Sequence, residues 1–341
     1  MLDRPRRFSI KQIAAQAGVS KATVDRVLHQ RGSVHYQTHR RIQQALAELE
    51  AQETCGLAVG RTFHIDVILH TPRRFSDAVK EAIHTQLGTL APFRIFPRFH
   101  LYQHIDPQRM QALILRCVSN GSQGVILKAA DEPEISAAVN QVTAAGVPVV
   151  TLVSDLTHSE RIGYIGMDNR TAGQTAAYLL TRWLDDATQD VAVVISSQHF
   201  RGEAERHGGF CSWLHERAPH VRVVEVSGGL GVYPPTLQRM TQALEQHPSI
   251  KAVYSVGGGN RAIVDAFAAL ARPLRVFIGH DLDQENRQLL AEEKIAAIID
   301  HNLQLDARHA FTRILQFHRL WKAGPIAPSP VQIVTPFSLA H

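Results

Sequence analysis

Residues 9–28 read SIKQIAAQAGVSKATVDRVL, a stretch that predicts two short amphipathic helices joined by a tight turn. One face of the first helix carries Ile10, Ile13, Ala14 and Ala17, spaced as on a single helical stripe. Ser9 followed three residues later by Gln12 is the capping-box pattern of a helix start, and Gly18 is a typical helix stop. Ser20 is placed to cap the second helix. The buried stripe of that second helix is Val24, Val27 and Leu28.

A third amphipathic helix is expected after a polar loop. Its apolar face carries Ile42, Ala45, Leu46 and Leu49. Three short helices with a Gly-containing turn between the first two form the helix-turn-helix layout. In that geometry the second helix lies in the major groove of DNA and leads with its N-terminal residues. Those residues are Ser20, Lys21, Ala22 and Thr23, with Arg26 one turn further along the exposed side.

The charge of the chain is unevenly distributed. Its first 61 residues hold ten Lys and Arg and five acidic residues, whereas the rest holds 26 of each, so the net charge of +5 lies entirely in that segment. A compact basic module on a neutral body is typical of a surface that faces phosphate. A basic terminus that is merely soluble would give the same count, so the charge alone does not identify a DNA-binding module. It agrees with the one that the helix pattern predicts.

Residues 10–49, IKQIAAQAGVSKATVDRVLHQRGSVHYQTHRRIQQALAEL, resemble the DNA-binding head of the lactose/galactose repressor (LacI/GalR) family, without a gap. The resemblance implies that the base-reading positions are Lys21, Ala22 and Arg26. It implies phosphate contacts for Ser20, Thr23, Ser33 and Thr38. Helix capping is an equal and compatible interpretation of Ser20 and Thr38.

Asp25 and His29 depart from the family pattern, which has Ser and Asn at these positions. A carboxylate on a DNA-facing helix either accepts a hydrogen bond from a cytosine amino group or pairs with Lys21 or His29 one turn away. We favour the pair within the helix. We assign His29 itself to a phosphate contact.

The linker, residues 51–61, lacks the Tyr-x-Pro-Asn signature that the family places before a short hinge helix. In the family a Leu of that hinge helix wedges into the minor groove and kinks the operator. Leu57 is the one Leu available for this role. A hinge helix and a flexible or differently registered linker therefore both remain open.

From Phe63 onward, short apolar runs alternate with amphipathic stretches. The runs that we expect to form strands are 64–69, 124–127, 147–153, 191–195, 221–226, 252–256, 276–278 and 296–299. Such regular alternation predicts an α/β fold with parallel sheets covered on both faces. The segment is too long for one doubly wound sheet of this spacing, which favours two lobes, although a TIM barrel also alternates strands and helices.

Residues 163–180, GYIGMDNRTAGQTAAYLL, resemble a helix start shared by effector domains of the same family and by periplasmic sugar-binding proteins. The resemblance implies two lobes, a chain that crosses between them three times, and a ligand in the cleft beyond the strand ends. We expect a head at 1–50, a linker at 51–61 and an effector and dimerisation domain at 62–341. Its lobes are expected at about 62–163 with 302–325, and 164–301 with 326–341.

The same resemblance assigns residues to the cleft. Arg206, near the start of a helix, is expected to fork onto sugar hydroxyls, and Asp281, at a strand end, to accept hydrogen bonds from them. Phe75 is expected to stack on a sugar ring, and His301 replaces an amide or similar polar group of the family. Weaker candidates are Asp155, Asn260 and Lys128. For every candidate the alternative is a strand-end polar residue or a helix cap.

Nothing in the sequence points to an enzyme, because GxSxG, Walker A, HExxH and closely spaced His/Cys patterns are all missing. No cofactor or metal is expected. A membrane span and a secretory signal are also missing. The widely spaced cysteines, Cys55, Cys117 and Cys211, are typical of a reducing cytoplasm.

We therefore expect a cytoplasmic repressor that binds a pseudo-palindromic operator as a homodimer or dimer of dimers. Its effector is expected to be a sugar, polyol or sugar acid that shifts the relative orientation of the lobes. A soluble sugar-binding protein without a transcriptional role is the alternative. An enzyme with a fused regulatory head is a more distant one.

Overall fold

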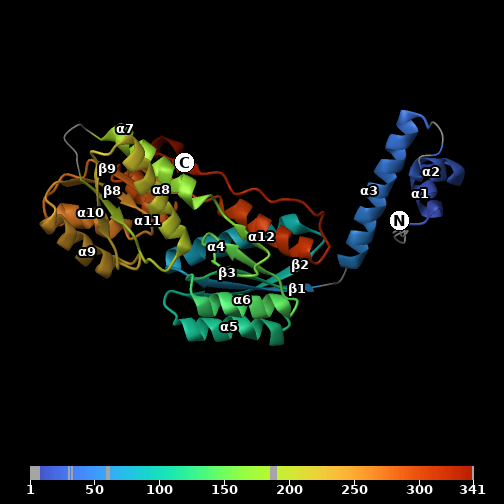
Figure 1. The fold of residues 1–341 in the computed structure, drawn as a ribbon, viewed down its shortest axis with the longest axis horizontal. Coiled ribbons are helices and arrows are strands. Elements are labelled where there is room, and N and C mark those ends of the chain that lie inside the picture. Colours follow the sequence, from blue (N-terminus) through green and yellow to red (C-terminus); the bar gives the residue numbers. More distant parts are fainter. Residues whose placement is uncertain (1–7, 30, 32–33, 59–61, 185–189, 340–341) are drawn as a thin grey trace. The chain divides into compact units, whose positions relative to one another are not determined.

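The computed structural model describes residues 8–29, 31, 34–58, 62–184 and 190–339 (Figure 1). The chain divides into two units, one formed by residues 1–62 with 91–94 and the other by residues 63–90 with 95–341. We call the first unit the head and the second the body. No helix in the described part of the chain is long and apolar enough to cross a membrane.

The head contains the three expected helices, α1 (Ile10–Ala17), α2 (Lys21–Leu28) and α3 (Tyr36–Ala58). Ser9 and Gln12 form the predicted capping box, and Gly18 ends α1 in the left-handed conformation with φ of +61°. The three helices share a small apolar core that contains Phe8, Ile13, Ala14, Ala17, Val24, Val27, Ile42 and Ala45. The helix-turn-helix layout is therefore confirmed.

The helix α3 continues to Ala58, so residues 51–58 extend the third helix rather than forming a separate hinge helix. Ser33 and residues 59–61 lie outside the described residues, and so does the side chain of Leu57. The expected roles of Ser33 and Leu57 stay predictions.

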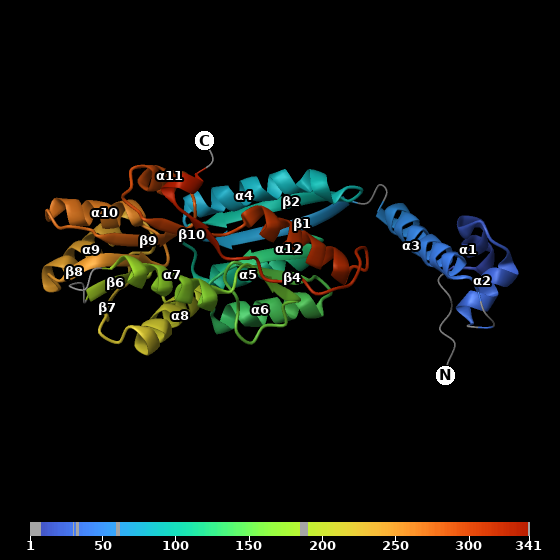
Figure 2. The ribbon, with the colours of Figure 1, turned by 90° about the horizontal axis from the view of Figure 1, so that it is seen from above.

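The first lobe of the body is built on a five-stranded sheet in the order β2-β1-β3-β4-β5. The strands are β1 (Thr62–His70), β2 (Arg94–Tyr102), β3 (Gly124–Lys128), β4 (Val149–Leu152) and β5 (Gly163–Ile165). Helices α4 (Arg73–Leu87) and α12 (Leu303–Phe317) cover one face, and α5 (Pro107–Ser119) and α6 (Pro133–Ala144) cover the other (Figures 1 and 2). A short 3-10 helix, η1 (Gly88–Leu90), follows α4.

The second lobe is built on a six-stranded sheet in the order β11-β10-β9-β8-β6-β7. The strands are β6 (Asp190–Val194), β7 (Arg222–Val226), β8 (Ile250–Ser255), β9 (Val276–His280), β10 (Ala297–Asp300) and β11 (Gln332–Val334). One core lies under α7 (Asn169–Trp183) and α8 (Arg201–Arg217). The core on the opposite face lies under α9 (Tyr233–Gln246), α10 (Asn260–Ala269) and α11 (Gln284–Ala291), and a 3-10 helix, η2 (Pro336–Ser338), follows β11.

The strand pairing excludes the TIM-barrel alternative, because the strands form two separate open sheets. All eight expected strands are present within two residues of the predicted bounds. Three were not predicted: β2, an edge strand that contains Pro97, and the three-residue strands β5 and β11. The first sheet thus extends to Ile165, just beyond the expected boundary at 163.

Three connections join the lobes: from β5 to α7, from β10 to α12, and from α12 to β11. The first and third run side by side, since the Ser329 amide donates to the Gly166 carbonyl at 2.9 Å and Met167 pairs with Ser329 in a parallel bridge. The predicted threefold crossing is therefore present. Parallel strands in both lobes end facing the space between them, which is where an α/β protein binds ligands.

Candidate functional site

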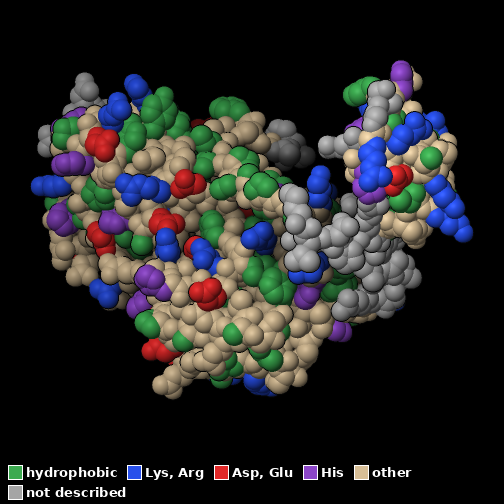
Figure 3. All heavy atoms as spheres, turned by 45° about the vertical axis from the view of Figure 1, so that its right-hand side comes forward, with side chains coloured by type: hydrophobic (Ala, Val, Ile, Leu, Met, Phe, Trp, Pro, Cys, Tyr) green, Lys and Arg blue, Asp and Glu red, His purple; other side chains and the backbone are tan. Residues whose placement is uncertain are grey.

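The helix α2 presents the DNA-reading residues that the sequence predicts. Its Val24 and Val27 are buried, whereas Lys21, Ala22 and Arg26 are exposed. The Ser20 hydroxyl accepts a hydrogen bond from the Thr23 amide at 3.1 Å, which confirms its capping role. Figure 3 shows Lys and Arg side chains gathered over the head. An exposed basic helix of this kind can enter the major groove while its apolar face stays in the core.

Asp25 on the same helix is paired rather than free. Its Oδ1 lies 2.8 Å from the Nδ1 of His29, one turn away, and its Oδ2 lies 3.9 Å from the Arg31 guanidinium. The pair within the helix that we favoured is therefore present, with His29 as the partner. Thr38 lies half-buried in the first turn of α3.

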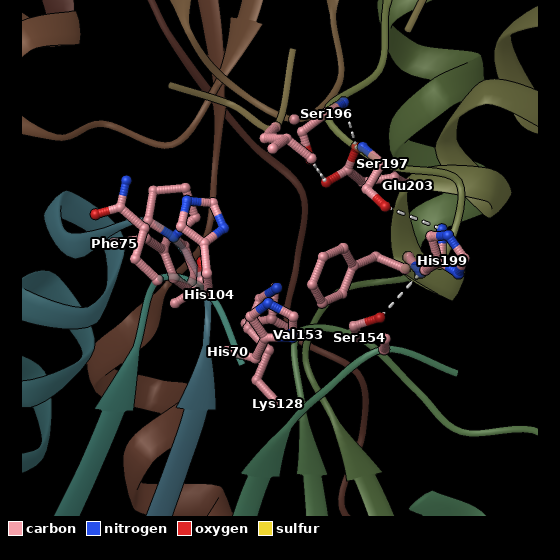
Figure 4. A pocket seen from close by; sticks show the side chains of 18 of the residues that line it. His70, Phe75, His104, Lys128, Val153, Ser154, Ser196, Ser197, His199 and Glu203 are labelled. Atoms are coloured by element: carbon pink, nitrogen blue, oxygen red, sulfur yellow. Dashed lines mark hydrogen bonds between the residues drawn. The ribbon is translucent and has the colours of Figure 1, made fainter. Parts of the chain in front are cut away.

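A cavity of about 500 Å³ lies between the two lobes of the body. Figure 4 shows His70, Lys128 and Val153 at the ends of strands of the first lobe, opposite Ser196 and Glu203 of the second. Parallel sheets expose their carboxyl ends at one edge, so each lobe contributes such an edge to the cavity. The cavity is large enough for a small organic ligand.

Hydrogen bonds hold the lobes together around this cavity. The Arg74 Nε of α4 donates to Asp283 Oδ2 at 2.7 Å, and the Gly202 amide of α8 donates to the Ser154 hydroxyl at 3.2 Å. The Asp131 amide donates to the His199 carbonyl at 2.8 Å. A ligand in the cavity would therefore lie among contacts that depend on the relative position of the lobes.

Arg206, from α8, lies at the centre of a buried network that lines the cavity. Its Nε donates to Asn169 Oδ1 at 2.8 Å and its Nη1 to the Val256 carbonyl at 3.0 Å. Its Nη2 lies 2.8 Å from the Nε2 of His301. These contacts use three of the five N–H groups of the guanidinium, which leaves two for a ligand.

His301 is buried, contacts Arg206 and does not itself line the cavity. Because a guanidinium only donates, His301 Nε2 must accept, and the ring carries its proton on Nδ1. Burial, with the positive charges of Arg206 and Lys128, holds the pKa of His301 well below its ordinary value. The side chain therefore stays neutral and orients the guanidinium.

Asp281 follows β9 and lines the cavity in an unusual conformation, with φ of +67°. Its Oδ1 is buried and has no hydrogen-bond partner among the described residues. Burial raises the pKa of this carboxyl to about 6, although the positive charges of Arg206 and Arg74 act in the opposite direction and lower it. Val153 and Leu230, which also line the cavity, have φ of +64° and +54°. Strained backbone gathered around an unsatisfied acceptor is typical of a binding site.

Phe75 and Lys128 complete the floor of the cavity on the side of the first lobe. The Phe75 ring is buried and stands edge-on to His301, with the ring centroids 6.2 Å apart. The Lys128 Nζ lies 5.8 Å from the centroid of that ring and 4.3 Å from the centroid of the Phe200 ring. Four of the predicted cleft residues, Phe75, Lys128, Arg206 and Asp281, thus line one cavity.

Besides His301, two more predicted residues, Asp155 and Asn260, do not line this cavity. Asp155 is tied to the Arg161 guanidinium and accepts from the Thr151 hydroxyl at 2.7 Å, so it stabilises the turn after β4. Asn260 begins α10, is buried, and donates to Asn286 Oδ1 at 2.9 Å. Both are polar residues near strand ends whose side chains bond within their own lobe.

Sequence reasoning missed several lining residues. His70 ends β1, so the strand-end argument applied to Lys128 could have identified it; burial and the charge of Lys128 lower its pKa to about 4. Phe200 directly precedes α8 and Glu203 lies in its first turn, and no sequence motif marks either residue as part of a binding site. Both Glu203 oxygens accept hydrogen bonds from Ser196, one from its amide at 2.8 Å and one from its hydroxyl at 2.5 Å. Among the described residues no group of His, Cys, Asp and Glu is arranged to hold a metal ion.

Two family models match the chain. Residues 9–50 match bacterial regulatory proteins of the lacI family, and residues 75–314 match a periplasmic binding protein domain. The first describes regulators and the second a binding domain. No curated protein sequence matches the chain.

Solved structures share the fold of the body at low sequence identity. A glucose-galactose binding protein from Geobacillus stearothermophilus is 17% identical, with a TM-score of 0.73, covering 82% of this chain and 99% of its own. A solute binding protein from Burkholderia graminis in complex with D-arabinose is 19% identical, with a TM-score of 0.73 and coverage of 80% and 95%. A proposed LacI transcriptional regulator from Bacteroides fragilis is 16% identical, with a TM-score of 0.70 and coverage of 81% and 97%.

Proposed function

Since this chain belongs to the lacI family of bacterial regulatory proteins and carries a periplasmic binding protein domain, we propose that it is a repressor controlled by a small polyhydroxylated molecule. That effector binds in the cavity between the lobes and sets the affinity of the head for operator DNA. The two sites are coupled through the relative orientation of the lobes. The chain acts by binding and has no catalytic role.

The arrangement of Arg206 and Asp281 carries this proposal. Two donors of the Arg206 guanidinium and one carboxylate oxygen of Asp281 have no partner among the described residues, and both side chains line the same cavity. A hydroxyl group both donates and accepts, so vicinal hydroxyls satisfy such a pair. The buried Phe75 ring offers an apolar face beside them. The names of the solved neighbours, which include glucose-galactose and arabinose binding, favour the same ligand class.

The head supports the DNA-binding half of the proposal. One helix-turn-helix of this size makes few contacts with DNA, so tight and specific binding requires two heads on a pseudo-palindrome. We therefore propose a homodimer that works inside the cell. The lobe contacts around the cavity, such as Arg74 with Asp283, are those that an effector can strengthen or break.

The proposal is tested with the full chain and duplexes selected from a random pool. The selected operator is titrated in the presence and absence of each sugar, polyol or sugar acid that raises the melting temperature of the protein. We expect specific binding to a pseudo-palindromic duplex and a change in that affinity of about 5- to 150-fold with the effector. Effector binding without specific duplex binding would instead favour a soluble sugar-binding protein.

Arg26→Ala tests the DNA-reading role of α2. If Arg26 reads a base, operator binding weakens by about 1–3 kcal/mol and the preference at one base position flattens. Arg116→Ala, at an exposed position of α5 in the body, is the matched control and should leave DNA binding unchanged. An equal loss on all sequences would make Arg26 a phosphate contact.

A further inference from the structure

Lys128, the last residue of β3, is a buried cation without a polar partner. Only 8% of the residue is exposed, and no hydrogen bond or ion pair joins its ammonium to any described residue. Its contacts are the rings of Phe75 and Phe200, one from each lobe. Cation–π contacts of this kind offset only part of the cost of removing an ammonium group from water.

The acidic residues near Lys128 form no direct ion pair with it. Glu203 and Asp281 both influence it electrostatically, but neither lies within ion-pair distance. Glu203 is already held by Ser196. Burial, together with Arg206, lowers the pKa of Lys128 to about 8, so the ammonium form still prevails near pH 7. The side chain lines the cavity as a positive charge with three donors available.

Helices α4 and α8 both begin at the cavity, but only α4 lacks a side-chain acceptor there among the described residues: in the first turn of α8 the Gly202 amide donates to the Ser154 hydroxyl at 3.2 Å, and Glu203 adds a negative charge. Pro72 precedes α4 and Phe200 precedes α8, and neither provides a side-chain hydrogen bond to its helix. Both residues line the cavity. Helices α5, α7, α11 and α12 are capped by an Asp or Asn, whereas α6, α9 and α10 also lack a side-chain cap. The N-terminus of α4, which has neither a side-chain cap nor an acidic residue in its first turn, carries a partial positive charge that favours an anion.

We propose that the effector is anionic, and that its carboxylate or phosphate group binds at Lys128 beside the N-terminus of α4. Its hydroxyl groups reach Arg206 and Asp281 at the other side of the cavity. The inference rests on the proposed function, since it names the class of molecule that the same cleft takes. A neutral sugar could accept a hydrogen bond from Lys128, but it would leave the buried charge without a direct ionic partner, stabilised only at a distance by Glu203 and Asp281.

Matched ligand pairs test the proposal on the full chain. The pairs are D-gluconate with D-glucitol, D-galacturonate with D-galactose, and D-glucose 6-phosphate with D-glucose. Within each pair the molecules differ mainly in the anionic group, and the pairs separate carboxylate from phosphate. By calorimetry near pH 7 we expect the acidic member of the best pair to bind about tenfold or more tightly than its neutral partner.

Three variants locate the effect. Lys128→Met should reduce the preference for the acid to about twofold or less, whereas Lys128→Arg should retain most of it. Lys294→Met removes an exposed charge of the same lobe as Asp281 and should change nothing. The melting temperature of the ligand-free Lys128→Met protein should equal or exceed that of the wild type, because a buried unpaired charge has been removed.

The outcomes separate this inference from the proposed function. Tighter binding of the neutral member, no binding of any acid, or an acid preference that survives in Lys128→Met would overturn the anionic effector. A neutral ligand that binds more tightly than its acidic counterpart and changes operator affinity would overturn the anionic effector but would support the proposed repressor function. An acid whose binding depends on Lys128 but does not alter operator affinity would support the anion site and contradict the proposed regulation.

Discussion

The head and the cavity use positive charge in opposite ways. In the head, Lys21 and Arg26 are exposed to solvent on a short helix. In the cavity, Lys128 and Arg206 are almost fully buried, and Arg206 is held by three hydrogen bonds. Exposed cations act on DNA mainly by displacing counterions, whereas buried cations act through fixed donors where screening by salt is weak. One chain thus combines an adaptable electrostatic surface with a preorganised site.

Salt should separate the two regions most strongly. Raising the salt concentration from about 50 to 200 mM should weaken operator binding by about 10³-fold or more, because each neutralised phosphate releases counterions. Binding of an effector in the cavity should change by only a few-fold over the same range. Both titrations use the same protein sample. Operator binding that does not respond to salt would contradict the role assigned to the basic head.

Arg206→Ala should show what the buried arrangement contributes. The change removes the donors expected to hold the effector and leaves Asn169, the Val256 carbonyl and His301 without their partner. Each lost buried hydrogen bond costs about 1–3 kcal/mol, so effector affinity should fall about tenfold or more and the melting temperature should drop. Operator binding of the ligand-free protein should stay nearly intact. Unchanged effector affinity, measured by calorimetry, would mean that the effector binds elsewhere.

The fold was largely predictable from sequence because its signals are local. Capping at Ser9, the stop at Gly18 and the regular strand–helix alternation each depend on neighbouring residues. The strands that escaped prediction lack such signals: β2 contains Pro97 on a sheet edge, and β5 and β11 are too short to show a pattern. The length of α3 was also missed, because the family signature, rather than helix propensity, guided the expectation for residues 51–58.

The cavity was less predictable because its residues come from many strand ends. Arg206 and Asp281 were found through position in a resembling fold. The same argument also selected Asp155, whose carboxylate is instead tied to Arg161. Whether a strand-end side chain faces the cavity or its own lobe depends on neighbours that are distant in sequence. Lys128 shows where prediction from sequence ends, because its lack of a polar partner among the described residues can be seen only when both lobes are in place.

The pH response should distinguish Lys128 from the other charged groups of the cavity. Its pKa is lowered to about 8, so the ammonium is lost, and with it the attraction for an anion, as the pH rises through that value. Asp281, with a pKa of about 6, and His70, with a pKa of about 4, titrate mainly below this range. Between about pH 7 and 9 the affinity for the acid should therefore fall up to tenfold.

Lys128→Arg is the control for this response, because a guanidinium stays charged throughout that range. The affinity of this variant for the acid should be nearly independent of pH between about 7 and 9. Calorimetry on both proteins with the same acid gives the comparison. An equal fall in the variant would assign the titration to another group.

The smallest effect is expected at Asp25, the one acidic side chain described on α2. Asp25→Ser removes a negative charge from the DNA-facing helix and the ion pair with His29, while the contact of His29 Nδ1 with the backbone carbonyl of residue 25, at 3.0 Å, is kept. The lost pair costs the helix about 0.2–0.5 kcal/mol, while reduced repulsion should raise affinity for nonspecific duplexes by a few-fold. Fluorescence anisotropy with random and selected duplexes measures both. A loss restricted to duplexes with a cytosine at one position would show that Asp25 reads that base, and the pair with His29 would then be a feature of the DNA-free head alone.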